Sequence, residues 1–168
     1  EELNLQSEYR VIAVKDNTAF RVGGFDIIPF LIKHNTLEPF GYLIRHEEIG
    51  TLLFLTDCQT PEQYRFNGLT NMLIECNYAD DIINYNVRNN IIPEMLRNRI
   101  TKDHMELSTL KNWLLENDLS KINNIVLIHL SDKNSNSDRF KEEIHNLTHK
   151  RVTIAETGLE ININKTPF

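Results

Sequence analysis

The sequence has 168 residues, 40% of them hydrophobic, which is enough for one globular domain with a core of its own. Its formal net charge of −6 gives no overall positive field, so a phosphate-bearing partner would need a local binding site. The two cysteines, Cys58 and Cys76, form no CxxC motif, and no apolar stretch resembles a signal peptide or membrane span. We therefore expect a single domain over residues 1–168, without membrane contact and located in the cytoplasm.

The amino-terminal third of the chain has the pattern of β-strands. The runs YRVIAVKD (9–16) and FDIIPFLIK (25–33) are rich in β-branched and aromatic residues, and the glycines of VGG between them permit a turn. The segment FGYLIRHEEIGTLLFLTD predicts a hairpin of strands 41–46 and 51–56. If strand 25–33 runs up the sheet, the second strand runs down and the third runs up. Residues 34 and 57 should then emerge at the same edge.

From residue 71 onward, apolar strand-like runs alternate with amphipathic stretches. We expect strands at 71–76 and 124–130 and one or two short strands within 151–163. We expect helices at 79–89, 93–100 (opening at Pro93), 106–117 and 137–149. This alternation predicts right-handed parallel crossovers and therefore an α/β fold.

Three side chains with metal-ligating chemistry follow strands of the predicted sheet. His34 follows strand 25–33, Asp57 follows strand 51–56, and His129 stands at the end of strand 124–130. Open α/β sheets usually form their sites at this edge, and two imidazoles with a carboxylate suit zinc or manganese. Their long-range spacing fits no short ligand motif. A turn histidine, a strand-ending hydrogen-bond acceptor and a core histidine would explain the same residues.

Five segments occur together in an order that resembles a known family: KHNTLEPFGYLI, LLFLTDC, LIECNYA, RNRITKDHMELSTLKNWL and IVLIHLSDKNSN. They resemble the carboxyl-terminal half of the metallo-β-lactamase superfamily. The resemblance is nearest to its phosphodiesterase or nuclease branch, which includes transfer-RNA 3′-processing endonucleases, exonuclease-like bacterial proteins and phage cyclic-nucleotide phosphodiesterases. It covers roughly residues 20–160 and implies an α/β fold of the αββα sandwich type. This chain would supply roughly the carboxyl-terminal half to two-thirds of that sandwich.

The resemblance also implies roles for five residues. His34 would ligate one metal ion, Asp57 would bridge two, and His129 would ligate the second. His104 of HMELS would protonate the leaving oxygen as a catalytic acid, and Glu75 of IEC would orient that imidazole. The cofactor would be two divalent metal ions, Zn or Mn, and the substrate a phosphodiester in a nucleic acid or nucleotide.

Polar residues near these positions are candidates for substrate binding. Arg97, Arg99 and Lys102 form a cationic cluster before His104, and Arg99 is our candidate for gripping a phosphate. Cations near the carboxyl end of a helix are also favourable without any ligand.

A second group of candidates lies in the polar loop SDKNSNS. Ser131, Lys133 and Asn134 follow His129 directly, as substrate-facing residues would. Loops of this composition also serve simply as turns and helix caps, so both interpretations stay open.

The resemblance lacks one element, the HxHxDH motif that would supply most ligands to both metal ions. Three ligands spread over two metal positions leave each ion with about two protein donors, too few to close a site. The chain is then a carboxyl-terminal piece, which the polar start EELNLQSE without an initiating Met favours, or a partner chain supplies the missing amino-terminal half. A catalytically inactive domain used for binding or assembly is the third explanation.

The possible functions fall into three classes: a phosphodiesterase or nuclease, a related hydrolase of esters, thioesters or lactams, and a domain without catalysis. The HMELS and IEC segments favour the first class, because their resemblance is to phosphodiesterases. If the chain is half a domain, apolar strand surface should be exposed. We then expect association with the missing half or, as a further possibility, a homodimer.

Overall fold

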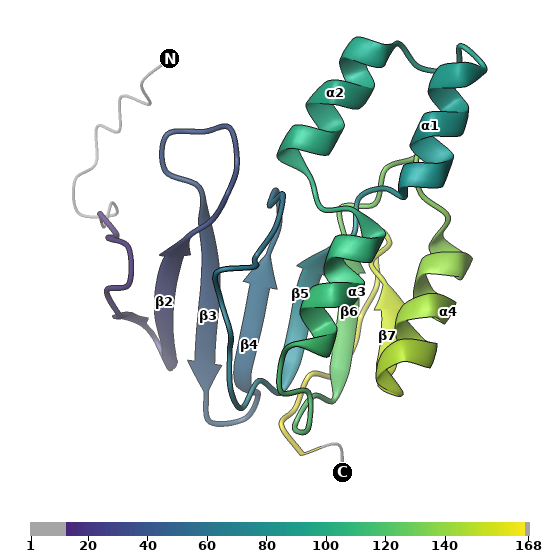
Figure 1. Ribbon diagram of the computed structural model, residues 1–168. Coiled ribbons are helices and arrows are strands. Elements are labelled where there is room, and N and C mark those ends of the chain that lie inside the picture. The colour runs from purple at the N-terminus through teal and green to yellow at the C-terminus, as the bar shows by residue number, and fades with distance from the viewer. Residues whose placement is uncertain (1–12, 167–168) are drawn as a thin grey trace.

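The computed structural model describes residues 13–166, which form one mixed sheet and four helices (Figure 1). The strands lie in sequence order as β1 (Phe20–Val22), β2 (Phe25–Leu31), β3 (Phe40–His46), β4 (Gly50–Leu55), β5 (Asn71–Glu75), β6 (Asn124–Ile128) and β7 (Arg151–Ile154). The helices are α1 (Asp80–Arg88), α2 (Glu94–Asp103), α3 (Leu107–Leu115) and α4 (Ser137–Thr148). Within 13–166, no helix combines the length and apolar character needed to cross a bilayer.

The strands change from antiparallel to parallel pairing at β4. Strands β1 to β4 are antiparallel neighbours, and β4 to β7 are parallel neighbours. Gly50 closes the β3–β4 hairpin at a φ of 72°, which glycine adopts without steric cost. The predicted hairpin and parallel crossovers are confirmed. The carboxyl ends of β2 and of β4 to β7 therefore meet at one edge of the sheet.

The strand expected at YRVIAVKD does not form where the structure describes it. Residues 9–12 lie outside the described part, residues 13–15 have no regular structure, and Asp16 and Asn17 form a turn. The Asp16 carboxylate accepts the backbone N–H of Leu31 at 2.8 Å, and the N–H of Asn17 donates to the carbonyl of Pro29. The Asp16 side chain therefore takes the N–H of Leu31, to which a further strand would have had to bond through its backbone carbonyl.

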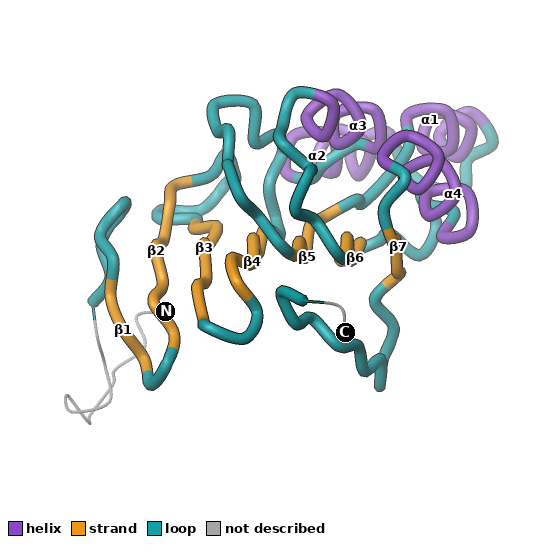
Figure 2. Tube along the Cα trace, turned by 90° about the horizontal axis from the view of Figure 1, so that it is seen from below, coloured by secondary structure: helices purple, strands orange, loops and turns teal. Residues whose placement is uncertain are grey.

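All four helices lie on the same side of the sheet (Figure 2), where α3 and α4 cover its face while α1 and α2 extend beyond its carboxyl edge (Figure 1). Strand side chains alternate between faces, and the core takes every second residue of β4, β5 and β6. Its fully buried strand members include Leu53, Leu55, Met72, Ile74, Ile125 and Leu127. The aromatic rings of Trp113 on α3 and Phe140 on α4 pack into the same core.

The opposite face of the sheet carries apolar side chains but no helix of the described residues (Figure 2). The cross-strand pairs place Ile44, Tyr42, Phe54 and Leu73 on this face. These four are only half-buried, whereas Leu53, Leu55, Met72 and Ile74 on the helix-covered face are fully buried. Leu52 and Val126, which share the face of the first four, are also buried. Residues 13–166 thus form one α/β layer pair. On the second sheet face the segment after β7 runs beneath the sheet (Figure 2), and no second layer of the described residues covers β2 to β4.

Candidate metal centre

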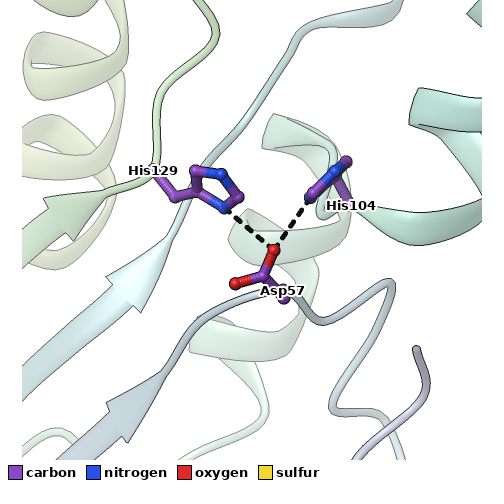
Figure 3. A group of neighbouring side chains, drawn as sticks. All are labelled: Asp57, His104 and His129. Atoms are coloured by element: carbon purple, nitrogen blue, oxygen red, sulfur yellow. Dashed lines mark ion pairs between the residues drawn. The ribbon is translucent and has the colours of Figure 1, made fainter. Parts of the chain in front are cut away.

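Asp57, His104 and His129 meet at the carboxyl edge of the sheet (Figure 3). Asp57 follows β4, His129 follows β6, and His104 follows α2. The Oδ1 atom of Asp57 lies 3.5 Å from Nδ1 of His129 and 3.9 Å from Nδ1 of His104. One ligating atom from each residue lies within 4.8 Å of the other two. This carboxylate and two imidazoles are a donor set that fits a divalent transition-metal ion.

Two of these residues have a left-handed backbone conformation. The φ angle is 52° at Asp57 and 56° at His129, so the chain turns sharply where each leaves its strand. Such a conformation in a residue other than glycine costs on the order of 1–3 kcal/mol and is concentrated at functional sites. The surrounding structure therefore holds both residues in place at an energetic cost.

Glu75, the last residue of β5, is a buried carboxylate between the two imidazoles. Its side chain is 0% exposed. Oε1 lies 2.8 Å from Nδ1 of His104 and 3.0 Å from Nδ1 of His129, while Oε2 accepts the backbone N–H of Cys58 at 2.7 Å. An unpaired buried carboxylate would be strongly destabilising, so these three contacts explain how Glu75 is accommodated. The contact that its predicted orienting role requires is present, and the role itself stays a prediction.

The hydrogen bonds determine which nitrogen of each imidazole is free. An ionised carboxylate can only accept, so Nδ1 of His104 and of His129 each donate a proton to Glu75. Nδ1 of His34 lies 3.1 Å from the carbonyl oxygen of Asp103 and donates in the same way. In the neutral imidazoles, Nε2 then carries the lone pair that can take a metal ion or a proton.

The bond to Glu75 also affects the protonation of His129. Acceptance of the Nδ1–H by Glu75 raises the pKa of His129, against the opposing effect of partial burial. Binding a metal ion at Nε2 requires the neutral ring, so protons and metal ions compete for this histidine.

His34 lies beside the three-residue cluster rather than within it. Its ring centroid is 6.0 Å from that of His104, and the predicted common edge of residues 34 and 57 is confirmed by the strand directions. The expected ligand set was His34, Asp57 and His129, whereas the compact cluster contains His104 in place of His34. The ligand role of His34 stays a prediction.

The proposed substrate-binding loop after His129 is partly structural. Asn134 is 2% exposed, donates from Nδ2 to Ser131 Oγ at 3.1 Å and accepts from Asn86 at 3.0 Å. The amide of Asn134 thus holds the loop, and its predicted substrate contact stays a prediction. Ser131 is half-buried as its partner, and Lys133 is exposed.

Asn77 and Asn86 contribute to the site in a way that the sequence did not indicate. The side-chain amide of Asn77 donates to the backbone carbonyl of His129 at 2.7 Å, and the backbone carbonyl of Asn77 accepts the N–H of Ser131 at 2.9 Å. Asn86 donates to the carbonyl of Lys133 at 2.8 Å. Both therefore hold the loop that carries His129. The only signal in the sequence was the position of Asn77 directly after the IEC segment.

The order of the strands, the helices on one face and the cluster at the carboxyl edge define a protein of the metallo-β-lactamase fold. No protein-family model and no curated protein matches the sequence. Among solved structures, the chain is similar to the metallo-β-lactamase fold protein YhfI from Bacillus subtilis. The TM-score is 0.58 at 17% identity, covering 88% of this chain and 54% of YhfI.

Two further structures share the fold. One is a diphosphatase from the PhnP family, with a TM-score of 0.52 at 18% identity, covering 86% of this chain and 46% of that protein. The other is Igni18, a metallo hydrolase from the hyperthermophilic archaeon Ignicoccus hospitalis, with a TM-score of 0.54 at 12% identity, covering 90% of this chain and 61% of Igni18. The chain therefore spans about half the length of the structures it resembles. At these identities the likeness establishes the fold, and the chemistry has to be argued from the site.

Proposed function

We propose that this chain is part of a metal-dependent hydrolase that cleaves phosphodiester bonds. The observation that carries the proposal is the buried Glu75 carboxylate, which accepts hydrogen bonds from both His104 and His129 beside Asp57. Burying a carboxylate is costly even when hydrogen bonds offset the cost, and buried ionisable groups of this kind are concentrated at functional sites. A domain kept only for binding or assembly would have no need of this arrangement.

The donor set fits a pair of divalent ions such as Zn or Mn. Asp57 would bridge the two ions, His129 would ligate one, and His34 would ligate the other through its free Nε2. When bound, such ions would polarise the phosphoryl oxygens and lower the pKa of water toward neutrality. Asn77 would keep the His129 segment in its left-handed conformation, and Asp103 would keep the His34 ring oriented through its carbonyl.

His104 is placed to act as the general acid. With Nδ1–H donated to Glu75, the ring is held so that a proton on Nε2 can pass to the departing ribose or deoxyribose oxygen. General-acid assistance of this kind is typically worth about 10²–10⁴ in rate. After the proton transfer, the hydrogen bond to Glu75 would keep the His104 ring in the same orientation.

The remaining metal ligands would come from outside this chain, on a missing amino-terminal half or on a partner chain. Two observations support this: the chain spans about half the length of similar structures, and the sheet face opposite the helices is apolar but only partly buried. A layer packed against Tyr42, Ile44, Phe54 and Leu73 would bury that face and bring its own side chains to the same edge. A homodimer would cover the face equally well.

We also propose a cytoplasmic location, on the chemistry of the two thiols. Cys58 and Cys76 are free and fully buried. Burial raises the pKa of both thiols, that of Cys58 to about 12, so they are inert and need no oxidising compartment.

The test compares substrates and histidine variants of the complete protein, that is, this chain together with the amino-terminal half or partner chain that supplies the remaining ligands, loaded with Zn²⁺ or Mn²⁺. We expect hydrolysis of bis(p-nitrophenyl) phosphate that a chelator abolishes. His104→Ala should lower kcat by about 10²–10⁴ with the metal content retained, whereas His129→Ala should lose metal. His145→Ala, an exposed histidine on α4, is the matched control and should change neither quantity.

Three results would reassign the site. Hydrolysis of p-nitrophenyl acetate without hydrolysis of the phosphodiester would make the protein an esterase of this fold. Loss of metal in His104→Ala would make His104 a ligand instead of the acid. Retention of metal without hydrolysis of either substrate would leave a non-catalytic domain.

A further inference from the structure

The helices α1 and α2 form a hairpin that extends beyond the carboxyl edge of the sheet (Figure 1). Its apolar contacts form a small cluster separate from the main core. The cluster consists of Tyr78, Ile83 and Ile92, with Val87 and Ile100 packed against it. The hairpin is thus stabilised by its own apolar contacts, and its outer surface does not pack on the sheet.

One face of α2 combines two cations with an exposed apolar side chain. Met95, Arg99 and Lys102 are spaced four and three residues apart, so they lie on the same helix face, and we call them the α2 stripe. All three are exposed, and Met95 is 82% exposed. Within residues 13–166, neither cation of the stripe forms an ion pair with a carboxylate.

The α2 stripe leads directly to the candidate metal centre. Lys102 stands two residues before His104, whose backbone N–H donates to the carbonyl of Ile100 at 2.9 Å and so continues the last turn of α2. At a rise of about 1.5 Å per residue, the stripe extends about 10 Å from the site along the helix. A polymer held along α2 would reach the end of the helix at Asp103, next to His104.

The charges of the hairpin favour an anionic polymer. The chain as a whole carries −6, yet nearby carboxylates do little to neutralise the stripe. Asp81 is paired with Arg139 at 2.6 Å and Asp103 is buried, while Glu94 stands at the far end of α2. A local group of cations in an acidic protein attracts phosphates where the protein as a whole repels them.

We propose that the α2 stripe binds the backbone of a single-stranded nucleic acid whose scissile bond lies at the metal centre. Arg99 and Lys102 contact successive phosphates, and Met95 contacts a sugar or base. This inference rests on the proposed function and narrows its substrate to a polymer, away from cyclic mononucleotides. A helix that docks on a protein presents apolar residues at these spacings, whereas two of the three positions here are cations.

The test measures binding in the presence of a chelator, so that it does not depend on catalysis. A labelled single-stranded oligonucleotide of about 20 nucleotides is titrated with the purified protein, by fluorescence anisotropy, over a range of salt concentrations. Arg99→Gln combined with Lys102→Gln should weaken binding at least about tenfold at low salt and reduce the slope of log K against log salt by about 1.4. Lys141→Gln, an exposed cation on α4, is the matched control and should change neither value.

Several results would overturn the inference while leaving the proposed hydrolase intact. These are no binding of the oligonucleotide, unchanged affinity and salt slope in the double variant, or equally strong binding of a cyclic mononucleotide. Self-association that Met95→Ala abolishes, with oligonucleotide binding unchanged, would make the stripe a protein contact. Conversely, oligonucleotide binding that the double variant weakens would support the stripe even if no phosphodiester hydrolysis were found. Circular dichroism of each variant checks that the helices are retained.

Discussion

The two ends of β5 both bury polar side chains but use them differently. At the amino end, Asn71 is 0% exposed, donates to the carbonyl of Ile163 at 2.7 Å and accepts from the amide of Asn124 at 2.8 Å. At the carboxyl end, Glu75 is 0% exposed and accepts from Cys58 and from two imidazoles. The first cluster is neutral and anchors the segment after β7, whereas the second is charged.

The two clusters differ most in which of their polar atoms have no hydrogen-bond partner within the chain. The amide of Asn71 bonds to groups of this chain at both its oxygen and its nitrogen, which is typical of a buried polar network that stabilises the fold. At the carboxyl end, hydrogen bonding consumes only Nδ1 of each histidine, and Asp57 and His129 adopt strained backbone conformations. We infer that the polar cluster at the amino end of β5 stabilises the fold, whereas the cluster at its carboxyl end has a role in metal binding and catalysis. Each prediction below tests that division.

The largest effect is expected from Glu75→Ala. This change leaves the N–H of Cys58 and two imidazoles without their buried acceptor. Removing one partner of a buried ionic network costs about 3–5 kcal/mol, so the free energy of unfolding should fall by that amount. Urea denaturation of the metal-free protein measures it.

Glu75→Gln is the matched control for this change. It keeps the side-chain volume and one oxygen for the N–H of Cys58, so it should lose less stability than the alanine variant. Its NH₂ group cannot accept the Nδ1–H of His104, so the ring loses its orienting hydrogen bond and phosphodiester hydrolysis should still be lost. Equal stability of Glu75→Ala and the unmodified protein would show that the carboxylate does not organise this edge.

A smaller effect is expected from Asn71→Ala at the other end of the strand. The carbonyl of Ile163 and the amide of Asn124 would lose a buried partner, which costs about 1–3 kcal/mol. Proteolysis near residues 160–166 should become faster, because Asn71 holds this segment. Metal content should not change. Metal loss in this variant would contradict the division between the two ends.

The sequence predicted the parts of this comparison that depend on periodicity and strand direction. Alternating apolar runs located β2 to β7, and the hairpin between β3 and β4 placed residues 34 and 57 at one edge. The segment HMELS, through its resemblance to a phosphodiesterase motif, pointed to His104, which the structure places against Glu75.

Other parts could not be read from the sequence, because they depend on single hydrogen bonds between distant residues. Asn71, Asn77 and Asn134 look like the many other asparagines of the chain, yet each has an amide committed to a particular partner. The edge contact of Asp16 with β2 likewise has no periodic signal. Such contacts become visible only once the strands are placed side by side.

The smallest expected effect is a difference in pH dependence between the two ends. Glu75 accepts the N–H of His129 and raises the pKa of that histidine in the folded protein. A raised pKa means that the folded state binds the proton more tightly than the unfolded state does. The stabilisation is therefore fully present below the ordinary histidine pKa of about 6.5 and is lost as the pH rises through the folded value.

For the metal-free protein, the urea midpoint should therefore decline as the pH rises above the ordinary histidine pKa of about 6.5, and His129→Gln should flatten this decline. Asn71→Ala should lower the midpoint equally at every pH, because the asparagine cluster contains no titratable side chain. If the urea midpoints of His129→Gln and of the unmodified protein changed with pH in parallel, the Glu75–His129 contact would make no pH-dependent contribution to stability. The distinction between a chemical and a structural end of β5 would then depend on His104 alone, since that imidazole makes the shorter contact with Glu75.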